Sequence, residues 1–448
     1  MIILWTDALI YLLVLSILVS GFFISRKPQL KRPLSKIAAS KTGMISLLML
    51  VFFVIIGLLD SVHFKDTDSR THEIISVLDY WAKPLRAQGE KTYSAPFSAY
   101  LYSKETMASE SGGQKWGYPR LMFGGSHLQH PETERVADVL NKSLIGFSKG
   151  AGLVLFFMIL LWSFLHDRHK YFLKGSTAKA VWLAAFFLIS ISYMLVYLSA
   201  YYHVLGTDKV GEDVFYQAIK SIRTGLVIGS LTTMIMLPLA IVFGIMAGFF
   251  RGWVDDLIQY VYTTLNSIPG VLLIAASILM VQVYMSNHAE DFNSLIVRSD
   301  MRLLFLCLIL GVTSWTGLCR MLRAETLKLR EMEYVQAAQA LGVRQGTILF
   351  RHILPNVMHI VLISVVLDFS SLVLAEAVLS YINIGVDPTT YSWGNMINGA
   401  RLEMARDPVV WWSLLASFVF MFSLVLAANL FADTVRNAFD PRRAEQGE

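Results

Sequence analysis

The sequence predicts an all-α protein built as a polytopic bundle of transmembrane helices. Of its 448 residues, 55% are hydrophobic and only 16% are charged, whereas an ordinary soluble domain has about 25% charged residues. The mean hydropathy is +0.54. The apolar residues gather in long runs that are nearly free of charge, as expected for helices that cross a bilayer. This composition excludes a simple soluble globule.

Nine apolar runs are candidates for membrane-spanning helices. The first run lacks a basic amino-terminal region and a small-residue cleavage site, so we predict a retained helix rather than a signal peptide. Pro238 and Pro269 fall inside their runs and are expected to kink or break those helices. The nine runs are residues 2–24, 43–59, 150–165, 180–201, 225–250, 257–285, 303–318, 357–379 and 409–431.

The basic residues predict the orientation of these helices. Lys and Arg cluster in the connections that follow the first, third and seventh runs, and basic loops stay in the cytoplasm. Alternation then places the amino terminus outside, the carboxyl terminus in the cytoplasm and residues 60–147 outside. The net charge of +5 follows from this topology, so we expect membrane lipid and no nucleic acid as a partner.

Motifs for catalysis and for metal binding are missing from the sequence. There is no phosphate-binding Gly-x-x-x-x-Gly-Lys-Ser/Thr loop, no Gly-x-Ser-x-Gly and no His-Glu-x-x-His, so we expect no enzyme activity and no catalytic residue. The pairs His127/His130 and His166/His169 lack further ligands at a suitable distance, and we expect no metal. Residues 111–114, Ser-Gly-Gly-Gln, look like part of an ATPase signature, but we interpret them as coincidence.

A polar segment between the seventh and eighth runs, residues 320–352, is predicted to lie in the cytoplasm. Residues 333–342 are rich in strong helix formers and end in Gly342, which suits the left-handed position after a helix. A basic stretch follows, and Leu354-Pro355 lies where the next membrane helix should begin. We therefore expect a helix, a glycine turn, a second helix and a membrane helix that starts with proline.

This segment resembles the cytoplasmic loop in the inner-membrane permease subunits of ABC importers. That loop carries a Glu-Ala-Ala signature, a glycine and a downstream Leu-Pro. The residues that match at this spacing are Ala337, Ala338, Gly342, Leu354 and Pro355. Gln336 stands in place of the signature Glu, and His352 in place of a frequent Ile. Glu333 is a nearby acid that could supply the missing charge.

Further sequence motifs narrow the resemblance to one subunit type, the second or C-type subunit of the dipeptide, oligopeptide and nickel permeases. The first motif is Leu205-Gly206-Thr207-Asp208, followed by Gly211 and Asp213. Later motifs are Gly-Trp-Val-Asp-Asp at residues 252–256, Ser-Ile-Pro at 267–269, Ala-Glu-Ala-Val-Leu-Ser at 375–380, Ser-Trp-Gly-Asn-Met at 392–396 and Asp-Pro-Arg at 440–442. They occur in the family's order and cover about residues 205–443.

The resemblance implies the type I ABC importer permease fold in a bacterial inner membrane. The implied partners are a second permease subunit, forming a heterodimer, two ABC ATPase subunits and an extracytoplasmic substrate-binding protein. The chain itself would bind no cofactor, and the partner subunits would use ATP and Mg. The residues implied in coupling to the ATPases are Glu333, Gln336, Ala337, Ala338, Gly342, Leu354 and Pro355, and those of the outer motif are Gly206, Thr207, Asp208 and Asp213.

Two acids in the eighth run, Asp368 and Glu376, are candidates for the translocation path, because ionisable groups in a membrane helix are costly and usually face a cavity or a partner. The alternative is a structural hydrogen bond, or for Glu376 a place at the membrane edge. The Gly225-x-x-x-Gly229 and Gly244-x-x-x-Gly248 spacings favour close helix packing, although a moving interface is also open.

The predicted organisation is an extra amino-terminal helix and basic linker (1–43), a transmembrane helix (44–59), an extracytoplasmic segment (60–147), two extra transmembrane helices (148–204) and the permease domain (205–443). Either the run 43–59 or the run 180–201 fills the position of the first core helix. Two rivals to an ATP-driven peptide permease are a secondary transporter of a peptide-like or cationic substrate that uses Asp368 and Glu376, and a membrane-anchored enzyme or scaffold that acts through the outer segment.

Overall fold

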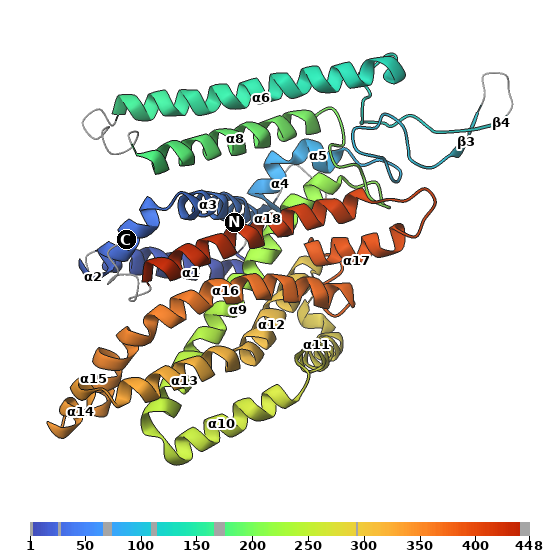
Figure 1. The fold of residues 1–448 in the computed structure, drawn as a ribbon. Helices are drawn as coiled ribbons and strands as arrows, with labels where there is room; N and C mark the ends of the chain where they lie inside the picture. The colour runs from blue at the N-terminus through green and yellow to red at the C-terminus, as the bar shows by residue number, and fades with distance from the viewer. Residues whose placement is uncertain are drawn as a thin grey trace. The chain divides into compact units, whose positions relative to one another are not determined.

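The computed structural model describes residues 3–25, 28–65, 74–108, 114–164, 175–292 and 294–439. Helices dominate these residues, as Figure 1 shows along the chain. Two short antiparallel hairpins are the exception: β1 (His63–Lys65) pairs with β2 (Ile74–Ser76), and β3 (Glu105–Ala108) pairs with β4 (Gln114–Gly117). The predicted all-α class is confirmed.

The chain divides into two compact units, each of which has its own core. The first unit contains Ala38–Arg223 and Tyr391–Leu424, and the second contains Ile3–Ile37, Thr224–Thr390 and Val425–Glu448. Two helices, α9 (Val214–Phe250) and α18 (Trp412–Phe439), begin in the first unit and end in the second.

Seven helices among the described residues are long and apolar enough to cross a membrane. Of the nine predicted spans, the first and the seventh fall outside this group. Helix α1 (Trp5–Ser25) has a shorter apolar stretch, Trp5–Val19, and α12 (Leu295–Ser314) carries Arg298, Asp300 and Arg302 in its first turns. The seven helices lie at Lys41–Asp60, Pro131–Leu160, Ser176–Ser199, Val214–Phe250, Gly270–Asn287, Gln345–Tyr381 and Trp412–Phe439.

In the first unit, α6 (Pro131–Phe164) packs along α8 (Ser176–Ser199), and α8 packs on α3 (Lys41–Asp60) (Figure 1). The contact is close, because a Cβ at Gly150 would lie 2.8 Å from the Ser190 Cα. Helix α6 begins well before the predicted apolar run 150–165. Its first turn carries Glu132 and Glu134, so hydropathy detects only its apolar end, and the segment 60–147 includes helical turns of α6.

Short elements complete the first unit. Helix α4 (Val77–Trp81) begins with a reciprocal capping box, in which Ser76 and Asp79 each accept a hydrogen bond from the other's backbone N–H. The remaining elements are α5 (Lys83–Ala87) and α17 (Trp393–Glu403). Leu85 of α5 packs against Phe215 and Tyr216 at the start of α9. The apolar core of this unit therefore includes the first turn of α9.

In the second unit, the carboxyl-terminal half of α9 packs closely on α13 (Thr316–Arg330). A Cβ at Gly244 would lie 2.8 Å from Leu322 Cβ, and one at Gly248 would lie 2.6 Å from Thr326 Cβ. Glycine therefore lets the two backbones approach each other at this pair. Gly229 similarly faces the ring of Phe369.

The predicted run 257–285 is not one helix. It is divided into α10 (Gly252–Ser267) and α11 (Gly270–Asn287), and Pro269 caps the second helix. Proline has no N–H to continue the first helix, which explains the break, whereas Pro238 lies inside the continuous helix α9.

The other elements of this unit are α2 (Pro28–Ala39), η1 (Ala289–Phe292), α14 (Glu333–Ala340), α15 (Gln345–Ile348), η2 (Leu349–Ile353) and α16 (Leu354–Tyr381).

Helix α1 is attached to α12 through buried polar groups. The Thr6 hydroxyl donates to an Asp300 carboxylate oxygen, and the Thr6 N–H lies 3.3 Å from the other one. Leu9 and Ile10 pack beside them on the core formed by α9, α11, α12 and α16. The predicted amino-terminal helix is therefore an integral part of the second unit.

Candidate functional site

The predicted cytoplasmic element is present with the expected order of parts. Helix α13 leads into α14, a glycine turn follows, and α15 and the π-helical turn η2 lead into α16. Gly342 has φ +71°, a conformation that glycine adopts without steric cost. Its N–H donates to the Gln339 carbonyl at 3.0 Å, and the Val343 N–H donates to the Ala338 carbonyl at 3.1 Å. Leu354 and Pro355 form the first turn of α16.

One face of α14 packs against the rest of the second unit. Val335 is fully buried and Ala338 is 8% exposed, and both join the core around Leu322, Ile348 and Ile353. The small side chain of Ala338 therefore serves the internal packing of this chain.

The other face of α14 is exposed. Glu333, Gln336 and Ala337 lie on it, and Leu341, in the turn, is 83% exposed. The Gln336 side-chain amide donates to the Glu331 carbonyl at 3.3 Å. This face of α14 is therefore not used for packing within the described part of the chain.

We call α13 and α14, residues 316–340, the α13–α14 arm. Three polar contacts connect this arm to neighbouring helices. Arg323 of α13 pairs with Asp255 of α10 at 2.6 Å. Arg251, in the turn between α9 and α10, pairs with Glu331. The Asn356 amide donates to the Tyr334 hydroxyl at 3.1 Å. Through these contacts the arm is connected to the end of α9 and to the starts of α10 and α16.

The two acids of α16 have different surroundings. Glu376 is 2% exposed and accepts a hydrogen bond from the Ser380 hydroxyl at 2.7 Å. Asp368 is half-buried, and its carboxylate forms no hydrogen bond or ion pair with the residues that the structure describes. Asp368 is thus the acid with free hydrogen-bonding capacity.

The Gly-Thr-Asp motif lies in the first unit, in a tight turn before α9. Gly206 has φ +72°, and a Cβ there would lie 2.4 Å from the Ser94 carbonyl oxygen. The Thr207 hydroxyl accepts from the Ser94 N–H at 2.7 Å and donates to the Thr92 carbonyl at 2.9 Å. Asp208 accepts from the backbone N–H of Glu212 at 2.9 Å. The motif thus shapes the backbone of the turn.

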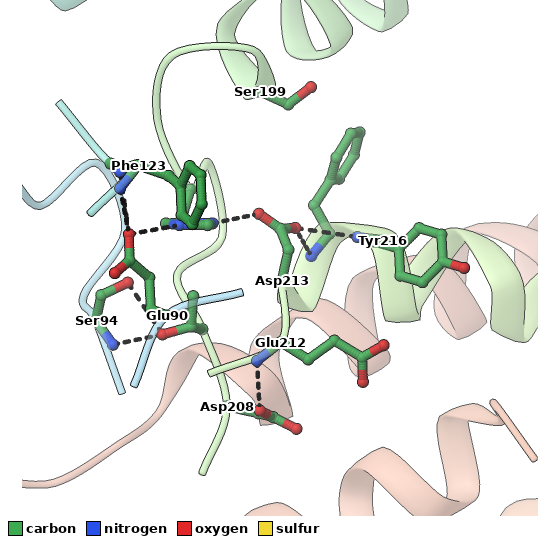
Figure 2. Close-up of polar contacts among 12 residues, drawn as sticks. Glu90, Ser94, Phe123, Ser199, Asp208, Glu212, Asp213 and Tyr216 are labelled. Carbon is green, nitrogen blue, oxygen red and sulfur yellow. Dashed lines mark hydrogen bonds and ion pairs between the residues drawn. The ribbon is translucent and has the colours of Figure 1, made fainter. Parts of the chain in front are cut away.

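Asp213 caps α9 and also binds a buried histidine. One carboxylate oxygen accepts from the N–H of Phe215 at 2.8 Å and of Tyr216 at 3.1 Å, and the other lies 2.7 Å from Nδ1 of His203. Nε2 of His203 lies 3.4 Å from the carboxylate of Glu90. Figure 2 shows this row from Glu90 to Asp213 and on to the first turn of α9. We call these three residues the His203 cluster.

Burial makes the charges of the His203 cluster interdependent. Burial by itself would lower the pKa of His203, but the hydrogen bond to Asp213 and the negative charges of Asp213 and Glu90 outweigh it and raise the pKa to about 9. Burial would raise the pKa of Glu90, whereas His203 and the N–H groups of Met122 and Phe123 lower it to about 2. At neutral pH the histidine is therefore a cation between carboxylates.

A second polar group holds the first turns of α9 against α4. The Lys220 ammonium lies 2.7 Å from Asp79, which also accepts from the Tyr216 hydroxyl at 2.7 Å. Burial alone would raise the pKa of Asp79, but Lys220 and the hydrogen bonds lower it below its usual value. Sequence reasoning missed Glu90, His203, Asp79 and Lys220, because their partners are far apart in the chain and no spacing pattern joins them.

The histidine pairs and the signature-like string of the sequence can be followed only where the structure describes them. Within the described part of the chain, no group of three or more His, Cys, Asp or Glu residues could hold a metal ion. His127 instead pairs with Asp138 at 2.8 Å. The His166/His169 pair, residues 111–113 of the Ser-Gly-Gly-Gln string and the Asp-Pro-Arg motif at 440–442 lie outside the described residues.

Comparison with known proteins identifies the family. Residues 240–445 match the model of the binding-protein-dependent transport system inner membrane component. A glutathione transport system permease protein of Pectobacterium atrosepticum is 28% identical over 288 residues, which are 60% of this chain and 89% of that protein. A dipeptide transport system permease protein of Lactococcus lactis is 29% identical over 54% of this chain and 65% of that protein.

An oligopeptide transport system permease protein of Mycobacterium bovis is 30% identical over 239 residues, which are 53% of this chain and 76% of that protein. The matched part contains the α13–α14 arm, and the seven apolar helices fit a multi-pass inner-membrane protein. The chain therefore belongs to the family of binding-protein-dependent transport system inner membrane components.

Proposed function

We propose that this chain is the membrane-spanning permease subunit of an ATP-driven ABC importer that carries peptides. Its relatives are permease subunits whose names specify glutathione, dipeptide and oligopeptide transport, and the cargo common to these names is a short peptide. A secondary transporter is not favoured, because the matching family is one of binding-protein-dependent transport systems.

The chain works with separate subunits that supply energy and cargo. They are a second permease subunit, two ABC ATPase subunits and an extracytoplasmic binding protein. ATP and Mg are used by the ATPase subunits, and the permease binds no cofactor and catalyses no reaction itself. The α13–α14 arm faces the cytoplasm, with the amino terminus outside and the carboxyl terminus inside.

One observation best supports coupling between ATP hydrolysis in the partner subunits and movement of the permease helices: α14 has one buried face and one exposed face. Val335 and Ala338 fix it to the permease, while Ala337 and the 83% exposed Leu341 are free for contact. An ATPase cleft that binds this exposed face would pull α14 and α13 as one body. Motion would then pass to α9, which approaches α13 at Gly244 and Gly248, and would switch the bundle between inward-facing and outward-facing states.

Asp368 is the residue that we place on the translocation path. Its carboxylate is half-buried in an apolar helix and has no partner among the described residues. Such a group is costly in a membrane unless it faces water or a cation, and a peptide presents a cationic amino terminus. Glu376 is the weaker candidate, because Ser380 already donates to it.

The test is affinity purification of the tagged chain in mild detergent, with identification of the co-purifying proteins and an ATPase assay of the complex. We expect a second permease subunit and ATPase subunits, with hydrolysis that a peptide and the binding protein stimulate. Recovery of the chain alone after crosslinking, together with peptide uptake that needs no ATP, would contradict the proposal.

A further inference from the structure

Helix α10 exposes a polar stripe along one side. A shallow cavity of about 450 Å³ runs beside this stripe, and all six of its lining residues belong to α10. At about 100° of rotation per residue these positions share less than half of the helix circumference. The lining residues, which define the α10 stripe, are Asp256, Gln259, Tyr260, Thr263, Thr264 and Ser267.

The rest of α10 separates into two other sides. Ile258 and Tyr262 are each 8% exposed and pack in the core of the second unit. Leu257 and Val261 are 54% and 40% exposed and lie between the buried side and the stripe. Trp253, in the first turn, is 76% exposed on the same side as the stripe. Beyond that turn the exposed surface of α10 has an apolar side and a polar side, as expected for a helix that meets lipid on one side and water on the other.

Contacts with α13 show how deep α10 reaches. Asp255 pairs with Arg323 near one end, and the Thr316 hydroxyl donates to Asn266 at 3.1 Å near the other. Next to Thr316, the ring of Trp315 lies 5.2 Å from that of Phe243. Phe243 is about 10 Å along α9 from its end at Phe250. Thus α10 runs along α13, from the α14 end to the level of the apolar turns of α9.

At that depth polar side chains cannot face lipid cheaply, because unsatisfied polar groups cost several kcal/mol in hydrocarbon. The Ser267 hydroxyl is satisfied by the Thr264 carbonyl at 2.7 Å, whereas the side chains of Tyr260, Thr263 and Thr264 are exposed and form no hydrogen bond with the described residues. This part of the stripe must therefore meet water or a polar molecule. Hydroxyl and amide groups both donate and accept hydrogen bonds, as the backbone groups of a peptide do. Between Gln259 and Ser267 the stripe has no charged side chain, so it can contact peptides of different side-chain charge without holding one of them strongly.

We propose that the α10 stripe lines the aqueous passage through which the transported peptide leaves toward the cytoplasm. The proposal rests on the function proposed above and adds the surface that the cargo meets. Asp256 lies at the end of the stripe nearest α14, and Ser267 lies at the end beside Thr316, where α13 begins.

Cysteine accessibility can test this surface directly. The two native cysteines, Cys307 and Cys319, are fully buried, so a single introduced cysteine is the main target of a thiol reagent. Thr263→Cys and Ser267→Cys probe the stripe, and Val261→Cys is the matched control on the apolar side of the same helix. The complete transporter is treated in inside-out vesicles with a membrane-impermeant methanethiosulfonate.

We expect both stripe cysteines to react at least ten times faster than Val261→Cys, and we expect a transported dipeptide to slow their reaction. A bimane label at Val261→Cys should be quenched by a doxyl lipid, and one at Thr263→Cys should not. Equal reactivity of the three positions, or reactive stripe cysteines that the peptide fails to protect, would overturn the inference.

ATP-dependent dipeptide uptake in the same vesicles separates the two proposals. If uptake is intact while the stripe is unreactive, the α10 stripe is not the passage and the importer function stands. If no ATPase subunit is present and uptake needs no ATP, the proposed function fails, whatever the cysteines show.

Discussion

Arg323 of α13 holds Asp255 of α10 with two parallel hydrogen bonds. Nε donates to Oδ1 at 2.6 Å, and Nη2 donates to Oδ2 at 2.7 Å. A forked pair of this kind fixes orientation as well as distance. It joins the helix that leads to α14 to the helix that carries the α10 stripe, so movement of the α13–α14 arm would be passed to the stripe.

Replacing Arg323 should uncouple peptide uptake from ATP hydrolysis. Lysine in Arg323→Lys keeps the charge but cannot form the forked pair, and losing one charged hydrogen bond corresponds to roughly a tenfold effect. We expect peptide uptake to fall about tenfold relative to ATP hydrolysis in the purified complex. Lys328→Gln is the control, because Lys328 is exposed and its 3.4 Å contact with Glu325 should contribute little. Unchanged uptake per ATP in Arg323→Lys would show that the pair transmits no motion.

Gly342→Val should abolish transport without removing the protein from the membrane. A Cβ at Gly342 would meet nothing within 4 Å, but its φ of +71° is unfavourable for other residues, at a cost of about 1–2 kcal/mol. The turn should therefore relax and displace Leu341, while the fold survives. Gly346→Val is the matched control, since Gly346 is equally open and has no positive φ. Wild-type uptake by Gly342→Val in membranes would contradict this prediction.

The His203 cluster predicts how the stability of the first unit depends on pH. The pKa of His203 is raised from 6.5 to about 9, so its contribution is complete below pH 6.5 and is lost as pH rises through 9. The shift corresponds to at most about 3 kcal/mol. The pKa of Glu90 is lowered from 4.5 to about 2, so its contribution is present above pH 4.5 and is lost as pH falls through 2.

Thermal unfolding of the purified protein between pH 6 and 10 checks this prediction. We expect the Tm of the wild type to fall on the alkaline side, and His203→Gln to have a lower Tm at pH 7 with a smaller alkaline decrease. His127→Gln, which breaks a partly exposed pair with Asp138, should keep the wild-type pH profile. An alkaline decrease of the same size in His203→Gln would rule out the His203 cluster as its cause.

Asp368→Asn should change substrate preference rather than stability. Removing a carboxylate without a described partner leaves no protein group unpaired, so we expect normal amounts in the membrane and slower uptake of cationic than of neutral dipeptides. Glu376→Gln should instead reduce the amount of folded protein, because Glu376 is buried and bonded to Ser380. If Asp368→Asn carries cationic and neutral dipeptides at wild-type rates, Asp368 does not line the path.

Hydropathy and local propensity predicted the parts of the fold that depend on one segment at a time. The helical class, the α14 helix and the turn at Gly342 belong to this group, because each follows from composition or from a residue type at one position. The same reasoning joined α10 and α11 into one span, although the break at Pro269 was expected, because both halves are apolar. It also placed the start of α6 too late, since the first turn of that helix is acidic.

Features that depend on distant segments could not be predicted. Glu90 meets His203 only after the backbone turns at Gly206 and Gly211 bring their segments together, and no sequence spacing encodes this approach. Ala337 and Ala338 are adjacent and chemically identical, but only the three-dimensional packing shows that Ala338 is buried while Ala337 is exposed.

A photo-crosslink from the exposed tip of the α13–α14 arm tests most directly whether α14 binds an ATPase subunit. Benzoylphenylalanine replaces Leu341, which is 83% exposed, or, as control, Leu402 of α17, which is 71% exposed, and the crosslinked products are identified in the intact complex. We expect position 341, and not position 402, to crosslink to an ATPase subunit, and we expect vanadate trapping to change the yield. A hydrolysing, transporting complex in which position 341 crosslinks to no ATPase subunit would contradict this expectation.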